Sequence, residues 1–322
     1  MALENSFHPI RGYLSGLEWD RTPRLDTLLS RYFGADDTPL NRAIGRIFMI
    51  AAVRRVRQPG CKFDEIVVLE GKQGTGKSTA LAILAGPENH SDQDILTLDA
   101  KGQMEALAGK WIYELSELEG IRKAETAKVK AFASRGSDRA RMAYGYFPEE
   151  RPRECIFIGT TNDDHYLSDP TGNRRFWPVR TEQIDLEALK RDRDQLWAEA
   201  AELEAEGEAI RLHKELWEAA AAEQVARTTR HPWMDTLVEV RGEEGNGEVV
   251  RASTKYLLGT VLQIEPGRQK PFDQTQLGIC MRELGWVGPK SMRIGGVNVR
   301  GYERSQPEGW TKDAVVGIRQ RL

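Results

Sequence analysis

The 322-residue sequence predicts an α/β protein in which a parallel sheet is flanked by helices. Two observations support this class. Short β-branched runs alternate with helical stretches in the central part of the chain, an order typical of parallel sheets. One such run leads directly into a glycine-rich loop that opens a helix. A helical region precedes the alternation and a small separate unit follows it, so we expect three regions, at residues 1–60, 61–230 and 231–322.

The first region is predicted to be helical because its apolar residues recur at helical spacing. Leu25, Leu28 and Leu29 form one such set, and residues 43–56 form a second amphipathic run that ends at Pro59-Gly60. In the second region we expect strands at 66–69, 95–98, 111–115 and 155–158. We expect helices at 77–85, 101–108 and 122–134, and a long Glu/Ala/Leu-rich helical region at 185–225.

The third region contains a linker or hairpin tip at residues 242–247. Helices are expected at 254–262 and 273–284, and a hairpin should turn at Gly295-Gly296. This order suits a small winged-helix-like unit whose basic wing contacts a nucleic-acid backbone. A purely structural cap explains it equally well.

Composition excludes several classes of protein. The chain is 40% hydrophobic with a net charge of −3, unlike a disordered chain. Its most apolar short run, residues 47–53, is far shorter than the ~20 residues of a membrane span. The three cysteines are widely separated and form no C-x-x-C, which argues against a disulfide framework or a zinc ribbon. With no apolar signal segment at the N-terminus, we expect a cytoplasmic protein.

Charge is segregated along the chain. Residues 121–153 and 251–304 each contain nine basic and four acidic residues, whereas residues 182–223 contain five basic and thirteen acidic ones. Separate basic blocks suit a protein that presents selected surfaces to a polyanion, although any single block can equally be a solvated surface. Aromatic residues within the first block, including Tyr146 and Phe147, favour nucleic acid as the partner.

Residues 71–78, GKQGTGKS, match the pattern G-x-x-x-x-G-K-[ST] at every fixed position. Such glycines allow backbone N–H groups to surround phosphate oxygens at the start of a helix. Lys77, at a solvent-facing helix start, is expected to reach the β- and γ-phosphates, and the Ser78 hydroxyl to ligate Mg²⁺. We therefore expect ATP and Mg²⁺ as cofactors. The predicted ATP-binding residues are Gly71, Gln73, Gly74, Thr75, Gly76, Lys77, Ser78 and Thr79.

Such a loop needs acidic groups nearby, and Glu114 and Glu117 end the predicted strand 111–115. One should hold Mg²⁺ and the other polarise the attacking water, but their spacing does not say which. Glu114 is the metal-ligand candidate, and Glu117 can also be loop surface. Asn162, after the strand 155–158, is expected to orient water against the γ-phosphate unless it only forms a turn.

Arg174 and Arg175 precede an apolar run and are candidates for an arginine finger that acts on a neighbouring subunit's ATP. Their alternative role is a structural salt bridge. The sequence does not indicate which of the two is the finger.

Ten short runs, taken together, resemble one known family. They are HPIRGYL at 8–14, WD at 19–20, PGCKFD at 59–64, LEG at 69–71, GKWIYELSEL at 109–118, KAF at 130–132, DR at 138–139, YG at 144–145, GTTN at 159–162 and GNRRFWPV at 172–179. The chain resembles the virulence-associated E family over roughly residues 7–215. Members of that family are similar to superfamily III helicases, AAA+ ATPases of phages, plasmids and genomic islands.

The resemblance implies an AAA+-type fold, ATP hydrolysis and assembly into a homo-oligomeric ring of six or so subunits. It implies translocation on single-stranded DNA during replication of a mobile element. Residues 134–151 would form a loop that enters the ring channel. The predicted DNA-binding residues are Lys130, Arg135, Arg139, Arg141 and Tyr144, which supply cations for phosphates and a ring for base stacking.

Many family members carry a primase-polymerase module upstream. The family's opening motif begins near residue 7 here, so we expect any priming to come from a separate protein. Two other functions remain open at this point. One is a small-molecule P-loop kinase, and the other is a non-motor, ATP-binding DNA-binding or regulatory protein.

Overall fold

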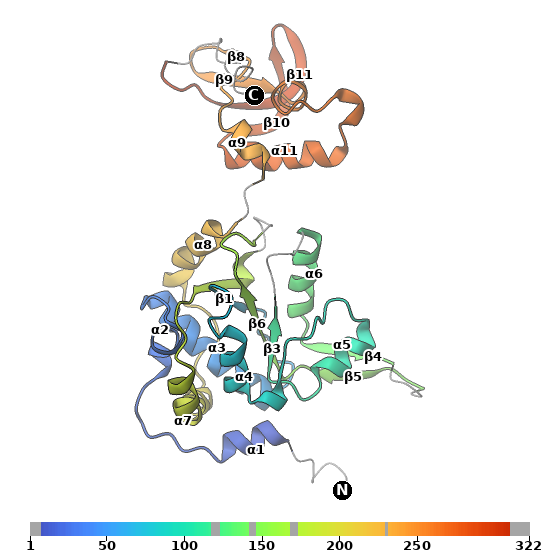
Figure 1. Cartoon of the computed structure of the whole chain (residues 1–322). Coiled ribbons are helices and arrows are strands. Elements are labelled where there is room, and N and C mark those ends of the chain that lie inside the picture. The colour runs from blue at the N-terminus through green and yellow to red at the C-terminus, as the bar shows by residue number, and fades with distance from the viewer. Residues whose placement is uncertain (1–7, 117–122, 142–145, 168–172, 229–230, 310–322) are drawn as a thin grey trace. The chain divides into compact units, whose positions relative to one another are not determined.

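The computed structural model describes residues 8–116, 123–141, 146–167, 173–228 and 231–309. Its chain divides into two compact units, Met1–Thr229 and Arg230–Leu322. The first unit contains a parallel sheet with helices on both faces, and the second contains a small antiparallel sheet (Figure 1). The predicted α/β class is therefore confirmed. No helix in the described part of the chain is long and apolar enough to cross a membrane.

The sheet of the first unit has the strand order β2-β3-β6-β1-β7, and all neighbouring strands are parallel. Its strands are β1 (Ile66–Glu70), β2 (His90–Ser91), β3 (Ile112–Leu115), β6 (Ile156–Thr161) and β7 (Phe176–Arg180). Successive side chains of β1 enter opposite cores: Val67 and Leu69 pack on one face, Ile66 and Val68 on the other. Burial on both faces explains why these strands are continuous apolar runs in the sequence.

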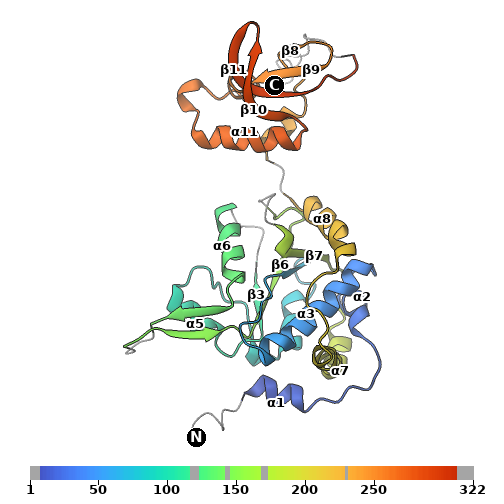
Figure 2. The ribbon, with the colours of Figure 1, turned by 180° about the vertical axis from the view of Figure 1, so that it is seen from behind.

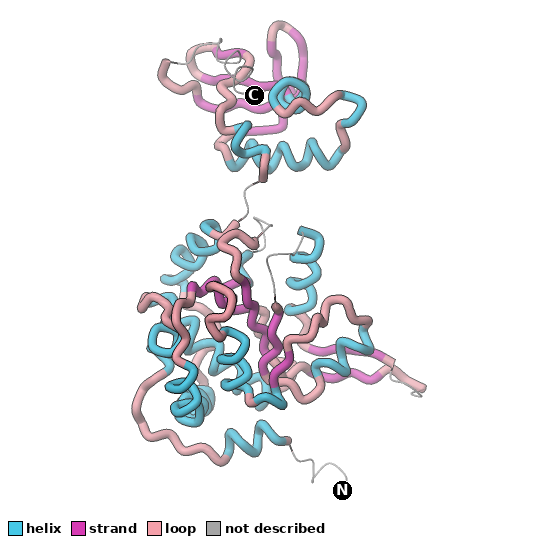
Figure 3. Tube along the Cα trace, viewed as in Figure 1, coloured by secondary structure: helices cyan, strands magenta, loops and turns pink. Residues whose placement is uncertain are grey.

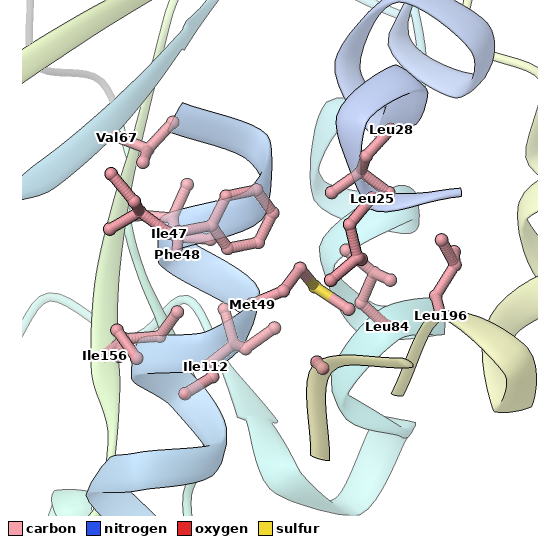
Figure 4. Close-up of a cluster of buried hydrophobic side chains, with 14 of the residues drawn as sticks. Leu25, Leu28, Ile47, Phe48, Met49, Val67, Leu84, Ile112, Ile156 and Leu196 are labelled. Atoms are coloured by element: carbon pink, nitrogen blue, oxygen red, sulfur yellow. The ribbon is translucent and has the colours of Figure 1, made fainter. Parts of the chain in front are cut away.

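Helices cover the two faces of this sheet unequally (Figures 1 and 2). The larger core lies between the sheet and α1 (Pro9–Ser15), α2 (Leu28–Phe33), α3 (Pro39–Arg57), α4 (Lys77–Ala85), α7 (Leu186–Ala205) and α8 (Trp217–Ala226). Figure 4 shows part of it, with Met49 of α3 directed toward Leu25 and Leu84. The smaller core lies under α5 (Ala100–Leu107) and α6 (Lys123–Ala133).

Two stacked tryptophans join β3 to α7 within the larger core. The rings of Trp111 and Trp197 lie 4.0 Å apart. Their indole N–H groups donate to Ala52 O at 3.0 Å and to Leu84 O at 2.8 Å. These bonds satisfy both buried polar groups and connect the sheet to α3 and α4, the helix that carries the glycine-rich loop.

An antiparallel hairpin, β4 (Ser137–Ala140) and β5 (Glu149–Pro152), extends away from the sheet of the first unit (Figure 3). A buried ion pair fixes its base, where Arg153 Nη2 donates to Asp138 Oδ1 at 2.7 Å. Arg153 also donates to Phe132 O at 2.6 Å and lies over the Phe132 ring. The base of the hairpin is therefore tied to α6.

The second unit has the sheet order β10-β11-β9-β8. Its strands are β8 (Glu244–Gly245), β9 (Val249–Ser253), β10 (Val287–Ile294) and β11 (Val297–Ser305). Its helices are α9 (Trp233–Leu237), α10 (Thr254–Tyr256) and α11 (Pro271–Glu283). A π-helical turn, Leu257–Val261, continues α10. Gly295 and Gly296 have φ of +59° and +81°, as the tight β10–β11 turn requires. A separate core around Trp286 and Leu277 holds this unit together.

The predicted strands at 66–69, 111–115 and 155–158 correspond to β1, β3 and β6. The prediction of a strand at 95–98 is wrong. Asp94 begins a turn there by accepting a hydrogen bond from Leu96 N, and the sheet ends instead at His90–Ser91. The predicted helical region 185–225 is interrupted by a turn, and the predicted loop 134–151 contains the β4–β5 hairpin. Strands β7 and β9 were not anticipated.

Candidate functional site

The glycine-rich loop connects β1 to α4 at the carboxyl edge of the sheet. A side chain at Gly71 would have its Cβ 2.8 Å from both Thr181 O and Thr181 Oγ1, so only glycine fits. Gly74 and Gly76 have φ of +80° and +94°, which other residues rarely adopt. Backbone N–H groups at the start of α4 are thus available to an anion, and the helix dipole favours one.

Lys77 points into this loop. Its Nζ donates to Gly71 O at 2.6 Å and to Lys72 O at 3.0 Å. The residue is only 9% exposed, so the expected solvent-facing position is wrong. The aliphatic stem is buried at the first turn of α4, which aims the ammonium group toward the curve of the loop.

Glu114 of β3 is the buried acid beside the loop. Its Oε1 accepts hydrogen bonds from Ser78 Oγ and Thr160 Oγ1, both at 2.7 Å. Its Oε2 lies 3.2 Å from His90 Nε2, an ion-pair contact without hydrogen-bond geometry. Burial raises the pKa of Glu114, but the polar contacts from His90, Thr160 and Ser78 outweigh it and hold the pKa below its usual value. Glu114 is therefore a carboxylate at neutral pH.

A hydroxyl and a carboxylate oxygen, the donors that Mg²⁺ prefers, meet at Ser78 and Glu114. Within the described residues no group of three or more His, Cys, Asp or Glu side chains could hold a metal by itself. In a nucleotide site, phosphate oxygens and water complete the ligand shell of Mg²⁺. Glu117, the other predicted acid, lies outside the described residues.

Asn162 directly follows β6, the strand between β1 and β3. Because the strands are parallel, its exposed side chain lies at the same edge as the loop and Glu114. The structure thus brings together the predicted residues Lys77, Ser78, Glu114 and Asn162.

Arg174 and Arg175 lie at the opposite edge. They immediately precede β7, and Phe176 pairs with Ile66 at the start of β1, whereas the loop follows Glu70 at its end. Five residues of strand, roughly 16 Å, separate the two edges. The arginines line a pocket of about 510 Å³ with Asp64 and Trp177.

The two arginines differ in their surroundings. Arg175 Nε lies 3.6 Å from Asp64 Oδ2, and its side chain is 27% exposed. Arg174 is exposed and makes no hydrogen bond or ion pair with any residue that the structure describes. The salt-bridge alternative thus applies to Arg175.

The predicted DNA-binding residues are not all in one place. Arg135, Arg139 and Arg141 are exposed on or beside the β4–β5 hairpin, and Tyr144 lies outside the described residues. Lys130 is instead buried on α6, where its Nζ donates to Asn173 Oδ1 at 3.4 Å. Lys130 is therefore not part of the exposed hairpin surface.

The family model of the virulence-associated protein E-like domain matches residues 14–229, the whole first unit apart from its first residues. The chain belongs to this family. The VapE-like family is one of P-loop ATPases, which implies that the protein binds ATP. A search of the curated proteins finds no match.

Solved structures with the fold of this VapE-like chain include an apo structure of the C-terminal region of NrS-1 and two A-form apo structures of the same region. They are 13–14% identical, with TM-scores of 0.50–0.53. Each alignment covers 90% of this chain and 77–78% of the other. At this identity the likeness establishes the fold alone.

Four residues of the VapE-like domain belong to the site or support it but were not predicted. His90 and Thr160 contact Glu114 from the two strands that flank β3. Glu70, directly before the loop, is buried and accepts hydrogen bonds from Arg227 Nε at 2.8 Å and Nη2 at 2.9 Å. The run GTTN contained a signal for Thr160, but nothing in the sequence connects His90 or Arg227 to partners 24 and 157 residues away.

Two exposed aromatic residues, Tyr146 and Phe147, were noted in the sequence but were not among the predicted DNA-binding residues. Tyr146 and Phe147 are 88% and 82% exposed, just before β5 on the hairpin. Exposure of two large rings beside arginines is typical of surfaces that stack nucleic-acid bases.

Proposed function

We propose that this protein is an ATP-driven DNA translocase or helicase that acts on single-stranded DNA in the replication of a mobile element, as a homo-oligomeric ring. The observation that carries the proposal is the position of Arg174. It is exposed, has no partner among the residues that the structure describes, and lies at the amino edge of the sheet, about one strand length from the ATP-binding loop of its own chain. An arginine finger at that position can serve ATP only on a neighbouring subunit, so hydrolysis depends on assembly.

Each residue of the carboxyl edge has a defined task in this scheme. The loop's N–H groups bind the phosphates, and the Lys77 ammonium pairs with the β- and γ-phosphates. Ser78 and Glu114 would hold Mg²⁺, which neutralises charge on the phosphates when bound. Glu117 would polarise the attacking water, and Asn162 would orient it. His90 and Thr160 position the Glu114 carboxylate.

Arg174 supplies the cation that stabilises the charge developing on the γ-phosphate of the neighbouring subunit. Arg175 positions the 173–175 turn through its ion pair with Asp64. This assignment resolves the choice between two adjacent arginines in favour of the exposed one.

The β4–β5 hairpin is the proposed DNA contact. Arg139 and Arg141 provide cations for backbone phosphates, and Tyr146 and Phe147 provide rings for unpaired bases. The anchored base, with Arg153 paired to Asp138, allows the hairpin to transmit movement of the ATPase core to bound DNA.

The test combines ATPase rate with native mass, each with and without single-stranded DNA. The proposal expects turnover that DNA stimulates and a ring-sized assembly in the presence of a non-hydrolysable nucleotide. A monomer that hydrolyses ATP independently of DNA, or transfers phosphate to a metabolite, would indicate a P-loop kinase. DNA binding without turnover would indicate a non-motor protein. Either result would contradict the proposal.

A further inference from the structure

The second unit contains a cationic pocket that the proposed function does not use. It has a volume of about 290 Å³ and lies between α11, the first residue of α10 and the strands β10 and β11. The polar residues that line it are Thr254, Gln274, Thr275, Arg282, Arg300 and Tyr302. No carboxylate is among its lining residues, so the charge of the pocket comes from two guanidinium groups.

Both arginines are available to a ligand. Arg282 and Arg300 are exposed, and neither forms a hydrogen bond or ion pair with another residue in the described range 231–309. Two other cations, on the sheet that carries Arg300, behave differently, because Arg251 lies 3.6 Å from Glu303 and Lys290 also pairs with that carboxylate. Unpaired arginines close to each other repel unless an anion lies between them.

Two further polar groups, both hydroxyls, converge on the pocket. A Cβ at Gly278 would lie 3.4 Å from both Arg282 Nη1 and Tyr302 Oη, so the guanidinium and the hydroxyl lie beside the same point of α11. The Tyr302 ring itself is buried. Thr254 Oγ1 is buried and has no hydrogen-bond partner in the described part of this unit, so a polar ligand would satisfy it. Two planar cations and two hydroxyl groups suit the oxygens of a phosphate group.

The surroundings of the pocket favour duplex DNA as the source of that phosphate. Helix α11 has 13 residues, roughly 20 Å, and a helix of this kind fits the major groove of B-DNA. The β10–β11 hairpin of the same unit carries exposed Arg293 near its turn. The one aromatic ring in the lining, that of Tyr302, is buried and offers no face to an unpaired base.

We propose that the pocket at Arg282 and Arg300 binds a backbone phosphate of double-stranded DNA, with α11 directed toward the duplex. This site is distinct from the β4–β5 hairpin, which contacts single strands in the proposed function. The two sites together would let one chain hold duplex and unpaired DNA through different units.

The experiment measures binding of the full chain to a fluorescent duplex and to a single strand of the same sequence, over a range of NaCl concentrations. The variant is Arg282→Gln/Arg300→Gln. Its matched control is Arg268→Gln, an exposed arginine of the same unit outside the pocket, paired with Glu265. A second variant, Arg282→Lys/Arg300→Lys, keeps both charges. DNA-independent ATPase activity and thermal unfolding show that each variant is folded.

We expect the Gln variant to bind duplex about tenfold more weakly or worse. The slope of log K against log salt should become shallower by roughly 0.9 for each phosphate that the variant no longer neutralises. Affinity for the single strand should be almost unchanged, and the control should bind like wild type. For the Lys variant, the slope of log K against log salt should stay close to that of the wild type, because both charges are kept.

Unchanged duplex affinity and slope in the folded Gln variant would overturn the proposal, as would an equal loss in Arg268→Gln. An equal loss on duplex and single strand would overturn the assignment to duplex DNA. Failure of the ring or of DNA-stimulated turnover would leave the duplex measurement unaffected, because it reports binding by the second unit.

Discussion

The two edges of the parallel sheet differ in how their polar groups are satisfied. At the carboxyl edge Lys77, Ser78 and Glu114 are held by partners within the same chain. At the amino edge Arg174 is exposed beside a pocket of about 510 Å³ and has no partner among the residues described. One edge is organised to hold a nucleotide, whereas the other presents a cation outward. The difference supports the proposal that two copies of the chain complete one active site together.

The largest effect is expected at the carboxyl edge. Lys77→Ala should lower ATP turnover by roughly 10²–10³-fold or more, because it removes the cation closest to the phosphates. Lys77 is buried, so we also expect removal of its two hydrogen bonds to reduce the free energy of unfolding by about 1–2 kcal/mol. Steady-state ATPase rates and chemical denaturation measure both. Lys72→Ala removes an exposed lysine of the same loop and is the control. Near wild-type turnover in Lys77→Ala would show that the loop 71–78 is not the site of ATP hydrolysis.

The next effect separates the two arginines of the amino edge. Arg174→Ala should lower turnover about 10³-fold, as expected for a finger, without changing ATP affinity or stability. Arg175→Ala should retain more activity, and loss of its half-buried ion pair should change stability by about 1 kcal/mol or less. ATPase rates and nucleotide binding of both variants test this order. A larger loss of turnover in Arg175→Ala than in Arg174→Ala would mean that Arg175 is the arginine finger and Arg174 the structural residue.

Smaller effects are expected on the hairpin. Tyr146→Ala should weaken single-stranded DNA binding by about 1–3 kcal/mol if a base stacks on its exposed ring. Nucleotide affinity should stay constant, since the ring lies outside the ATP site. Tyr256→Phe, on the second unit, is a control that leaves the hairpin unchanged. Equal DNA affinity for wild type and Tyr146→Ala would exclude stacking at this position.

The smallest effect concerns single phosphate contacts. Arg139→Ala and Arg141→Ala should each make the salt dependence of single-stranded DNA binding shallower by roughly 0.7 in log–log slope. Titrations at several NaCl concentrations measure this. Lys130→Ala should leave the salt dependence of single-stranded DNA binding unchanged, because Lys130 is buried and contacts Asn173, away from the hairpin surface. If Lys130→Ala changes the slope while both arginine variants do not, the DNA contact has been assigned to the wrong surface.

Local sequence patterns were enough to predict most of the fold and the centre of the site. The loop 71–78 is contiguous, so the spacing of its glycines and Lys77 was enough to identify it as the candidate phosphate-binding loop. Strands β1, β3 and β6 are buried on both faces, so each is a continuous apolar run. The same rule failed at residues 95–98, where buried Ile95 follows an Asp94 turn and joins no strand.

Contacts between distant segments could not be predicted from the sequence. His90 reaches Glu114 only because β2 and β3 are neighbours, and Arg227 reaches Glu70 because α8 ends beside β1. The choice between Arg174 and Arg175 likewise depends on Asp64, more than a hundred residues earlier in the chain. Periodicity describes one element at a time, whereas these partners are set by the order of strands in the sheet.

The most direct test of a shared active site mixes two inactive variants. Lys77→Ala subunits lack a working ATP-binding loop but retain Arg174, and Arg174→Ala subunits have the reverse defect. In an equal mixture up to about a quarter of the wild-type rate should return, because one of the four possible neighbour pairings combines both intact parts. Native mass spectrometry verifies that the subunits mix. If mixed assemblies form and no activity returns, Arg174 does not act on a neighbour's ATP, and the account is wrong.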